Sequence, residues 1–270
     1  MTTTYVLSGG AAELERLRLQ ARVWEPEAEA LLDQIGVASG WSCIDLGCGA
    51  MGILGPLSRR VGEAGRVIGV ELDPTQLAAA RAFVRQAGLT NVEVVERDAY
   101  ATGLPGAACD LVHVRFLFAP AGRDAQLLAE MRRLVRPGGV LAIQEPDGVA
   151  WTSSPWHPAW TRLTSVIRAA FARSGGDFDA GRRTYGMLRQ AGLHDVQVRA
   201  AVLALPHGHR YGRLPIQLAA SLRERIIEDG LIGVGELEDV IADCERVAAD
   251  PDTYITTFIV TQVWGRMPSS

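Results

Sequence analysis

Several residue types and patterns are missing from this 270-residue chain, and each absence excludes a class of protein. It contains no lysine, and its 27 basic residues are arginines spread along the chain. With a net charge of −4, this distribution argues against a nucleic-acid partner. No apolar run approaches a membrane span, and the first residues lack the basic segment and apolar core of a signal peptide. We therefore expect a cytoplasmic protein with no membrane partner.

Cysteine is also scarce. Cys43, Cys48, Cys109 and Cys244 are too few and too scattered for a disulfide framework, and none belongs to a Cys-x-x-Cys pair. We expect them to be small buried residues, and we expect no metal site. What the chain does have is a hydrophobic content of 48%, enough for a large core. Its length suits one large α/β domain, with or without a cap.

Short apolar segments alternate with amphipathic segments in the first half of the chain. Buried strands are expected because apolar residues occupy both faces of each run. Amphipathic helices are expected where apolar residues recur with a period of 3.6, and another helix should begin near Met51. This alternation predicts an open parallel sheet with helices on both faces. The expected strands are 41–46, 66–72, 92–97, 109–116 and 139–145, and the expected helices include 74–87 and 123–136.

Different patterns flank this region. We predict an N-terminal helical lid at 1–37, a core at 38–205 and 251–270, and a helical cap insertion at 206–250. Residues 151–180 are expected to contribute to the cap. Within these parts we expect helices at 8–22, 26–35, 158–173 and 180–191, and strands at 194–203 and 254–264.

A glycine loop follows the first expected strand, in the run Asp45-Leu46-Gly47-Cys48-Gly49. Glycines at such a turn let a ligand approach the backbone closely. Residues 47–52 also fit the dinucleotide pattern G-x-G-x-x-G, a match that is weak alone. A carboxylate at Asp45 suits the cationic ammonium of an amino-acid moiety better than a pyrophosphate.

Two further acids end the next two expected strands. Glu71 can accept both hydroxyls of a ribose, a feature shared by several cofactor types. Asp98 can accept from an adenine amino group, or it can cap a turn. The three acids together outline an adenosyl cofactor with an amino-acid moiety.

Five motifs, in order, carry a resemblance to a known family. The chain resembles the class I S-adenosylmethionine (SAM)-dependent methyltransferases over about residues 38–146, and within them the small-molecule, natural-product type. The resemblance implies a doubly wound, Rossmann-like seven-stranded sheet of order 3-2-1-4-5-7-6 whose seventh strand is antiparallel. One departure is Met51 where the family often has a third glycine, with Gly52 next. The motifs are Asp45–Gly49, Gly69–Asp73, Asp98–Ala99, Cys109–Val112 and Leu134–Val140.

The resemblance also implies how SAM is held. Asp45 and the backbone of Gly47, Cys48 and Gly49 would hold its methionine portion, and Glu71 its ribose. Leu72 would lie against the adenine, whose edge would meet Asp98 and Ala99. Val114 and Arg115 end the fourth strand beside the sulfonium, and His113 is there as a buried strand residue or a site residue. Arg115 would bind the cofactor carboxylate or pair with a surface acid, and Tyr5 and Gln20 of the lid would close over the methyl donor.

The acceptor side is less defined. Methyl transfer is an in-line displacement that chiefly needs alignment, and some acceptors also need a base. Glu145, at the tip of the fifth strand, and His157 are the catalytic candidates. The alternatives are that Glu145 orients the cofactor or caps a loop, and that His157 is an ordinary loop residue. Trp151, Trp156 and Trp160 would line an aromatic pocket or belong to the core.

The leading hypothesis is therefore SAM-dependent O-, N- or C-methylation of a small apolar or aromatic acceptor in secondary metabolism. A cap over the sheet disfavours an RNA or protein substrate. An NAD-type oxidoreductase is disfavoured by Asp45, and a non-catalytic module by the retained acids. The N-terminal helix would pack on its own domain or exchange with a second copy.

Overall fold

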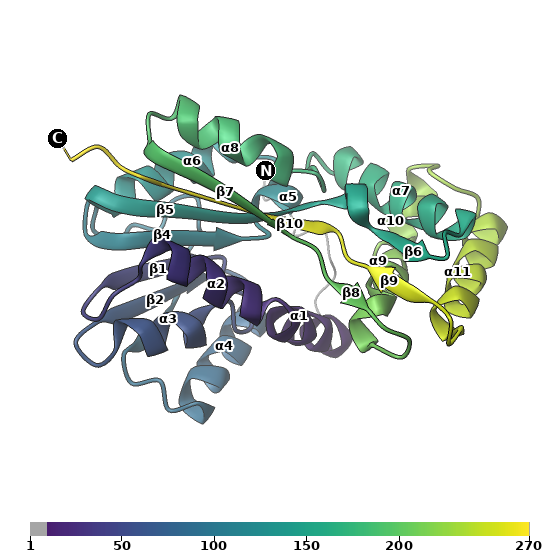
Figure 1. Cartoon of the computed structure of the whole chain (residues 1–270), viewed down its shortest axis with the longest axis horizontal. Helices are drawn as coiled ribbons and strands as arrows, with labels where there is room; N and C mark the ends of the chain where they lie inside the picture. Colours follow the sequence, from purple (N-terminus) through teal and green to yellow (C-terminus); the bar gives the residue numbers. More distant parts are fainter. Residues whose placement is uncertain (1–9, 270) are drawn as a thin grey trace.

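The computed structural model describes residues 10–269, and its centre is a seven-stranded sheet (Figure 1). The strand order is β3-β2-β1-β4-β5-β10-β7, and β10 runs antiparallel to both of its neighbours. The predicted Rossmann-like fold and its strand order are confirmed. The strands are β1 (Ser42–Leu46), β2 (Arg66–Glu71), β3 (Val92–Glu96), β4 (Cys109–Arg115), β5 (Val135–Asp147), β7 (His194–Ala201) and β10 (Ile259–Arg266).

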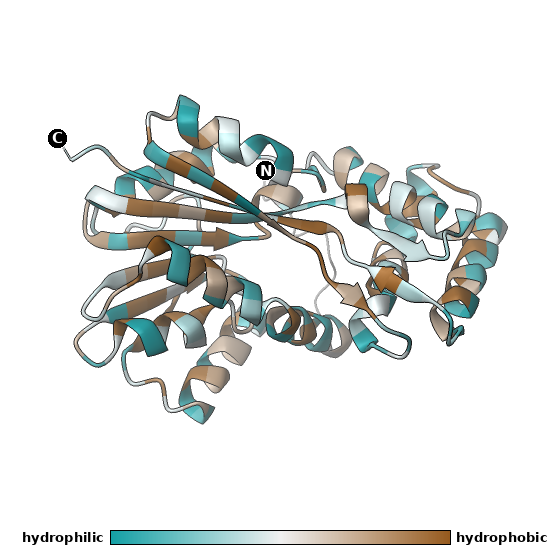
Figure 2. Cartoon of the chain, in the orientation of Figure 1, coloured by the Kyte–Doolittle hydropathy of each residue, from teal (hydrophilic) through white to brown (hydrophobic). Residues whose placement is uncertain are grey.

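Alternate residues of each central strand pack against helices on opposite faces of the sheet, and the strands are apolar along most of their length (Figure 2). Cys43 of β1 packs with one set of helices, whereas the adjacent Ile44 packs with the other set. One face is covered by α2 (Glu25–Ile35), α3 (Leu54–Val61) and α4 (Pro74–Gln86), and the other by α5 (Phe118–Ala121), α6 (Asp124–Leu134) and α8 (Gly181–Gln190).

A second, mainly helical lobe extends from the carboxyl end of the sheet (Figure 1). Its core is rich in aromatic residues, and Trp151 stacks on Phe178 with ring centroids 5.2 Å apart. Trp160 is fully buried and Trp156 is 66% exposed. The lobe contains α7 (Pro158–Arg173), α9 (Leu214–Ser221), α10 (Arg223–Glu228) and α11 (Val234–Ala249), with a small sheet of β6 (Thr152–Ser154), β9 (Tyr254–Thr256) and β8 (Ala204–Leu205).

The expected strand 254–264 is wrong as a single element, because the chain leaves one sheet for another. Residues of β9 pair in the small sheet and those of β10 in the large one. At the break, Thr257 exchanges hydrogen bonds with Leu203, donating its N–H to the Leu203 carbonyl and accepting the Leu203 N–H at its hydroxyl. The Phe258 side chain then turns into the aromatic core. The helix expected from Met51 begins later, at Leu54.

The N-terminal helix α1 (Ala11–Val23) runs between the two lobes (Figure 1). Its end is tied to the cap, since the Trp24 indole N–H donates to the Tyr211 hydroxyl at 2.9 Å. Tyr211 lies in the 3-10 turn η2 (Arg210–Arg213), which precedes α9. The lid and cap boundaries stay predictions.

Candidate cofactor site

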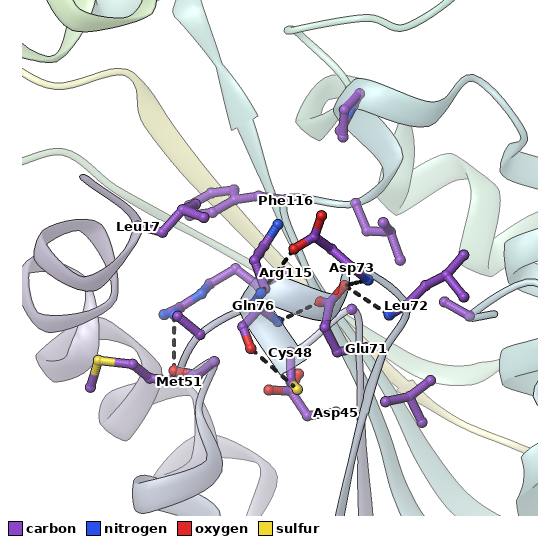
Figure 3. Close-up of a pocket in the computed structure, with 18 of the residues that line it drawn as sticks. Leu17, Asp45, Cys48, Met51, Glu71, Leu72, Asp73, Gln76, Arg115 and Phe116 are labelled. Carbon is purple, nitrogen blue, oxygen red and sulfur yellow. Dashed lines mark hydrogen bonds between the residues drawn. The ribbon is translucent and has the colours of Figure 1, made fainter. Parts of the chain in front are cut away.

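A cavity of about 340 Å³ opens at the carboxyl ends of β1, β2 and β4, beneath α1. The ends of parallel strands in doubly wound sheets are where such folds bind ligands. Figure 3 shows Leu17 and Phe116 on one side of this cavity and Asp45 and Cys48 on another. The glycine loop, the tip of β2 and Gln20 of α1 complete the lining.

Gly52 directly follows Met51, which stands where the family often has a third glycine. Its φ is +50°, in the left-handed region that favours glycine. A Cβ at this position would lie 2.1 Å from the Asp45 carboxylate. That carboxylate accepts the Ile53 N–H at 3.0 Å, so the turn wraps around Asp45 and only glycine fits there.

Glu71 ties the tip of β2 to the glycine loop. One of its oxygens accepts the Gly49 N–H at 2.8 Å, and the other accepts the N–H groups of Leu72 and Asp73, each at 2.8 Å. Burial raises the pKa of the Glu71 carboxyl, although these three hydrogen bonds oppose the shift. Glu71 thus shapes the rim on which the ribose is expected to lie.

Arg115 supplies a partly buried cation to the cavity. Its Nη2 donates to the Gly52 carbonyl at 3.1 Å, whereas its Nη1 is buried and has no hydrogen-bond partner among the described residues. Burial lowers the pKa of the guanidinium. A buried donor without a partner is costly, and a ligand carboxylate would satisfy it. The predicted contact between Arg115 and the cofactor carboxylate fits this geometry.

Most of the predicted cofactor residues line the cavity. Leu72 is 56% exposed there, as an adenine-facing residue requires. Asp98 accepts the Tyr100 N–H at 2.9 Å and so also caps a turn. Val114 is fully buried and is not among the lining residues, and Tyr5 lies outside the described residues. The predicted residues found in the lining are Gln20, Asp45, Gly47, Cys48, Gly49, Glu71, Leu72, Asp98, Ala99 and Arg115.

The two catalytic candidates lie elsewhere. Glu145 is fully buried, and its carboxylate accepts the N–H groups of Leu117, Phe118 and Ala119 at 2.7–3.0 Å. Burial raises the pKa of its carboxyl to about 7. His157 caps α7 by accepting the Ala159 N–H at 3.3 Å. Glu145 thus caps the loop at residues 117–119 and His157 caps a helix, so neither geometry requires a catalytic role. The catalytic roles stay predictions.

Several lining residues had not been singled out from the sequence, among them Phe116, Tyr100 and Arg123. Phe116 has a left-handed φ of +58°, a strained conformation for a bulky residue of the kind that concentrates at functional sites. The guanidinium of Arg123 lies 3.5 Å from the Tyr100 ring centroid. Because Phe116 directly follows Arg115, its place at the end of the fourth strand could be predicted from the sequence, whereas its backbone conformation could not.

The comparisons with known proteins cover the part of the chain that contains this site. Residues 43–139 match the family described as "Methyltransferase domain". That segment contains the whole glycine loop, β2 to β4, and β1 except for its first residue. Residues 43–139 are therefore similar to a methyltransferase domain, and the fold is that of the class I, SAM-dependent methyltransferases, whose cofactor is SAM.

Similar proteins extend beyond this segment. The chain is 33% identical over 178 residues to trans-aconitate 2-methyltransferase of Methylobacterium radiotolerans, covering 65% of this chain and 63% of that protein. It is 31% identical over 144 residues to demethylmenaquinone methyltransferase of Shouchella clausii, covering 53% and 57%. The chain thus spans less than two thirds of either relative's length. A SAM-dependent methyltransferase structure from Aquifex aeolicus is 21% identical with a TM-score of 0.53, covering 74% of this chain and 93% of that one, and shares the fold.

Within residues 10–269 no group of three or more histidine, cysteine, aspartate or glutamate side chains is arranged to hold a metal ion. No helix in that range has the length and apolar character needed to cross a membrane.

Proposed function

We propose that this protein transfers a methyl group from SAM to a small apolar or aromatic acceptor, by O-, N- or C-methylation in secondary metabolism. The observation that carries the proposal is the cavity beneath α1, which combines the glycine loop, the Glu71 rim and the Nη1 of Arg115, which has no partner within residues 10–269. When bound, SAM supplies an activated methyl group on a sulfonium. Asp45 would face its cationic amino-acid portion, and Arg115 would bind its carboxylate.

A second cavity of about 50 Å³, here called the acceptor cavity, adjoins the first. It is too small to hold an aromatic ring by itself, so we propose that it takes part of the acceptor and that the rest lies in the adjoining part of the first cavity. Gln20, Phe116 and Pro120 line both cavities, so the two cavities meet at these residues. The remaining lining is mostly apolar and aromatic, which suits an acceptor of the same character. It consists of Arg16, Ala119, Pro146, Phe171, Phe178, Leu214, Leu218 and Phe258.

The acceptor cavity offers little acid–base chemistry. Among the described residues its lining holds neither a carboxylate nor an imidazole. We therefore propose that alignment of the acceptor with the methyl group, and exclusion of water by the cap, supply most of the rate. Residues of the cap helix α9 form part of this wall, so a folded macromolecule is a poor fit.

The experiment is methyl transfer from isotope-labelled SAM to a small-molecule extract, to RNA and to protein, read by mass spectrometry. Labelling of small molecules is expected, and labelling of RNA or protein alone would overturn the proposal. Leu218→Phe should narrow the acceptor cavity. It is expected to raise KM for the acceptor about tenfold or more, while Kd for S-adenosylhomocysteine (SAH) stays within about twofold.

A further inference from the structure

A row of polar side chains crosses the sheet from the cofactor cavity to the far edge strand. It runs through Asp45 on β1, His113 on β4, Gln144 on β5, Gln262 on β10 and Arg199 on β7. Four of the five are at most 1% exposed, and Arg199 is partly buried. The interior of a mainly parallel sheet is normally apolar, so a continuous polar row needs an explanation.

The row is one connected chain of hydrogen bonds. Arg199 Nη1 donates to Gln262 Oε1 at 2.7 Å, and Gln262 Nε2 contacts Gln144 Oε1 at 2.8 Å. Gln144 Nε2 lies 2.8 Å from His113 Nε2, and His113 Nδ1 lies 2.7 Å from Asp45 Oδ1. Strand register supports the row, because Asp45 pairs with His113 and Gln262 pairs with both Gln144 and Arg199.

The outer end of the row sets the direction of every bond. Arg199 can only donate, so Gln262 must present its oxygen to it. Gln262 Nε2 also donates to the Glu27 carbonyl at 2.9 Å, which can only accept, and this fixes the same orientation. The Arg199 guanidinium is itself held by the Glu27 carboxylate at 2.5 Å.

The orientation of Gln262 in turn fixes the orientation of Gln144, which contacts the His113 imidazole. With its amide oxygen facing Gln262, Gln144 presents its N–H₂ group to His113 Nε2. That nitrogen must therefore be an acceptor, and the ring proton must sit on Nδ1, where it is donated to Asp45. A proton on Nε2 would face the Gln144 N–H₂ group, and removing that clash would require both amides to turn against Glu27 and Arg199.

We propose that Gln144, Gln262 and Arg199 are positioning residues that hold His113 in its neutral, Nδ1-protonated form, so that Asp45 keeps its full negative charge. This inference rests on the proposed function, because the charge matters for a cationic cofactor. Asp45 has one lone-pair direction left on each oxygen after the bonds to His113 and Ile53. A protonated His113 would cancel the Asp45 charge next to the ammonium and sulfonium of SAM.

The test compares SAM with SAH, two ligands that differ by the methyl group and its one positive charge. Gln144→Met removes the donor to His113 with little change in volume, and Gln262→Met breaks the row one step further out. Each is expected to raise the ratio of the SAM Kd to the SAH Kd by about tenfold. Gln217→Met, the same substitution in the cap helix α9, should leave the ratio unchanged.

The second measurement is nitrogen-15 NMR of the His113 ring in the wild-type protein. A protonated Nδ1 and an unprotonated Nε2 are expected. A proton on Nε2, or an unchanged SAM-to-SAH ratio in a folded Gln144→Met protein, would overturn the inference, and if neither variant folds the NMR result alone decides. A wild-type protein that binds neither ligand would instead refute the proposed function.

Discussion

Replacing Arg115 by methionine should weaken cofactor binding through one end of the ligand only. The Arg115 Nη1 is buried without a partner among the described residues, in a cavity that suits the methionine portion of SAM. Removing one member of a buried, hydrogen-bonded charge pair costs about 2–4 kcal/mol. At about 1.4 kcal/mol per factor of ten, Arg115→Met should raise the SAH Kd by about 30- to 1,000-fold.

The control for this prediction is a ligand rather than a variant. 5′-Methylthioadenosine keeps the adenosyl part of SAH and lacks its amino acid, so its Kd should change less than about threefold in Arg115→Met. Calorimetric titration of both ligands into wild-type and variant protein gives the four constants. An equal loss for both ligands would show that Arg115 supports the fold of the cavity and does not hold the carboxylate.

Three further predictions concern Glu71, Gly52 and Glu145. Glu71→Gln should weaken SAH and methylthioadenosine alike, by about 10- to 100-fold, because a charged acceptor of three backbone N–H groups is lost. Gly52→Ala should lower the free energy of unfolding in urea by more than Gly230→Ala. Both glycines have positive φ, at +50° and +64°, but only the Gly52 Cβ would strike Asp45. For Glu145, whose folded pKa of about 7 lies above the unfolded value near 4.3, the folded state binds the extra proton. The stability of wild type relative to Glu145→Gln should therefore fall as pH rises from about 4.5 to 7.

Each of these expectations has a result that contradicts it. A Glu71→Gln protein that loses SAH but retains methylthioadenosine would place Glu71 at the amino-acid end. Equal destabilisation by Gly52→Ala and Gly230→Ala would mean that the turn yields without disturbing Asp45. If the stability of wild type relative to Glu145→Gln stayed constant or rose between pH 4.5 and 7, the buried carboxylate would ionise as easily as an exposed one.

The sheet was predictable because its strands are continuous apolar runs between turn residues. Such runs are buried wherever they occur, so β1 to β5 could be located without knowing their neighbours. The break between β9 and β10 could not be predicted in this way. Thr257 pairs with Leu203, a residue 54 positions earlier, and local sequence contains no information on that contact.

The cofactor residues were predictable to a similar extent. Asp45, Glu71 and Asp98 stand at strand ends, where the alternation of strands and helices itself places them together. The direction of Glu145 depended on packing, because its carboxylate turns to the N–H groups of residues 117–119 instead of the cavity. The tryptophans show the same limit, since Trp151 and Trp160 entered the core of the cap.

The polar row depends on strand register alone. Gln144, Gln262 and Arg199 are separated by 55 or more positions in sequence, and each is unremarkable in its own segment. Only the pairing of β10 with both β5 and β7 puts them in one line. A shift of one residue in either register would turn a strand's side chains to the opposite face and break the row.

The central claim, that the cavity beneath α1 binds SAM, is tested most directly by one calorimetric experiment. Wild-type protein is titrated separately with SAM, SAH and NAD. SAM and SAH are expected to bind at one site per chain, and NAD is expected not to bind. Binding of NAD alone would contradict the claim and move the protein to another class of enzyme.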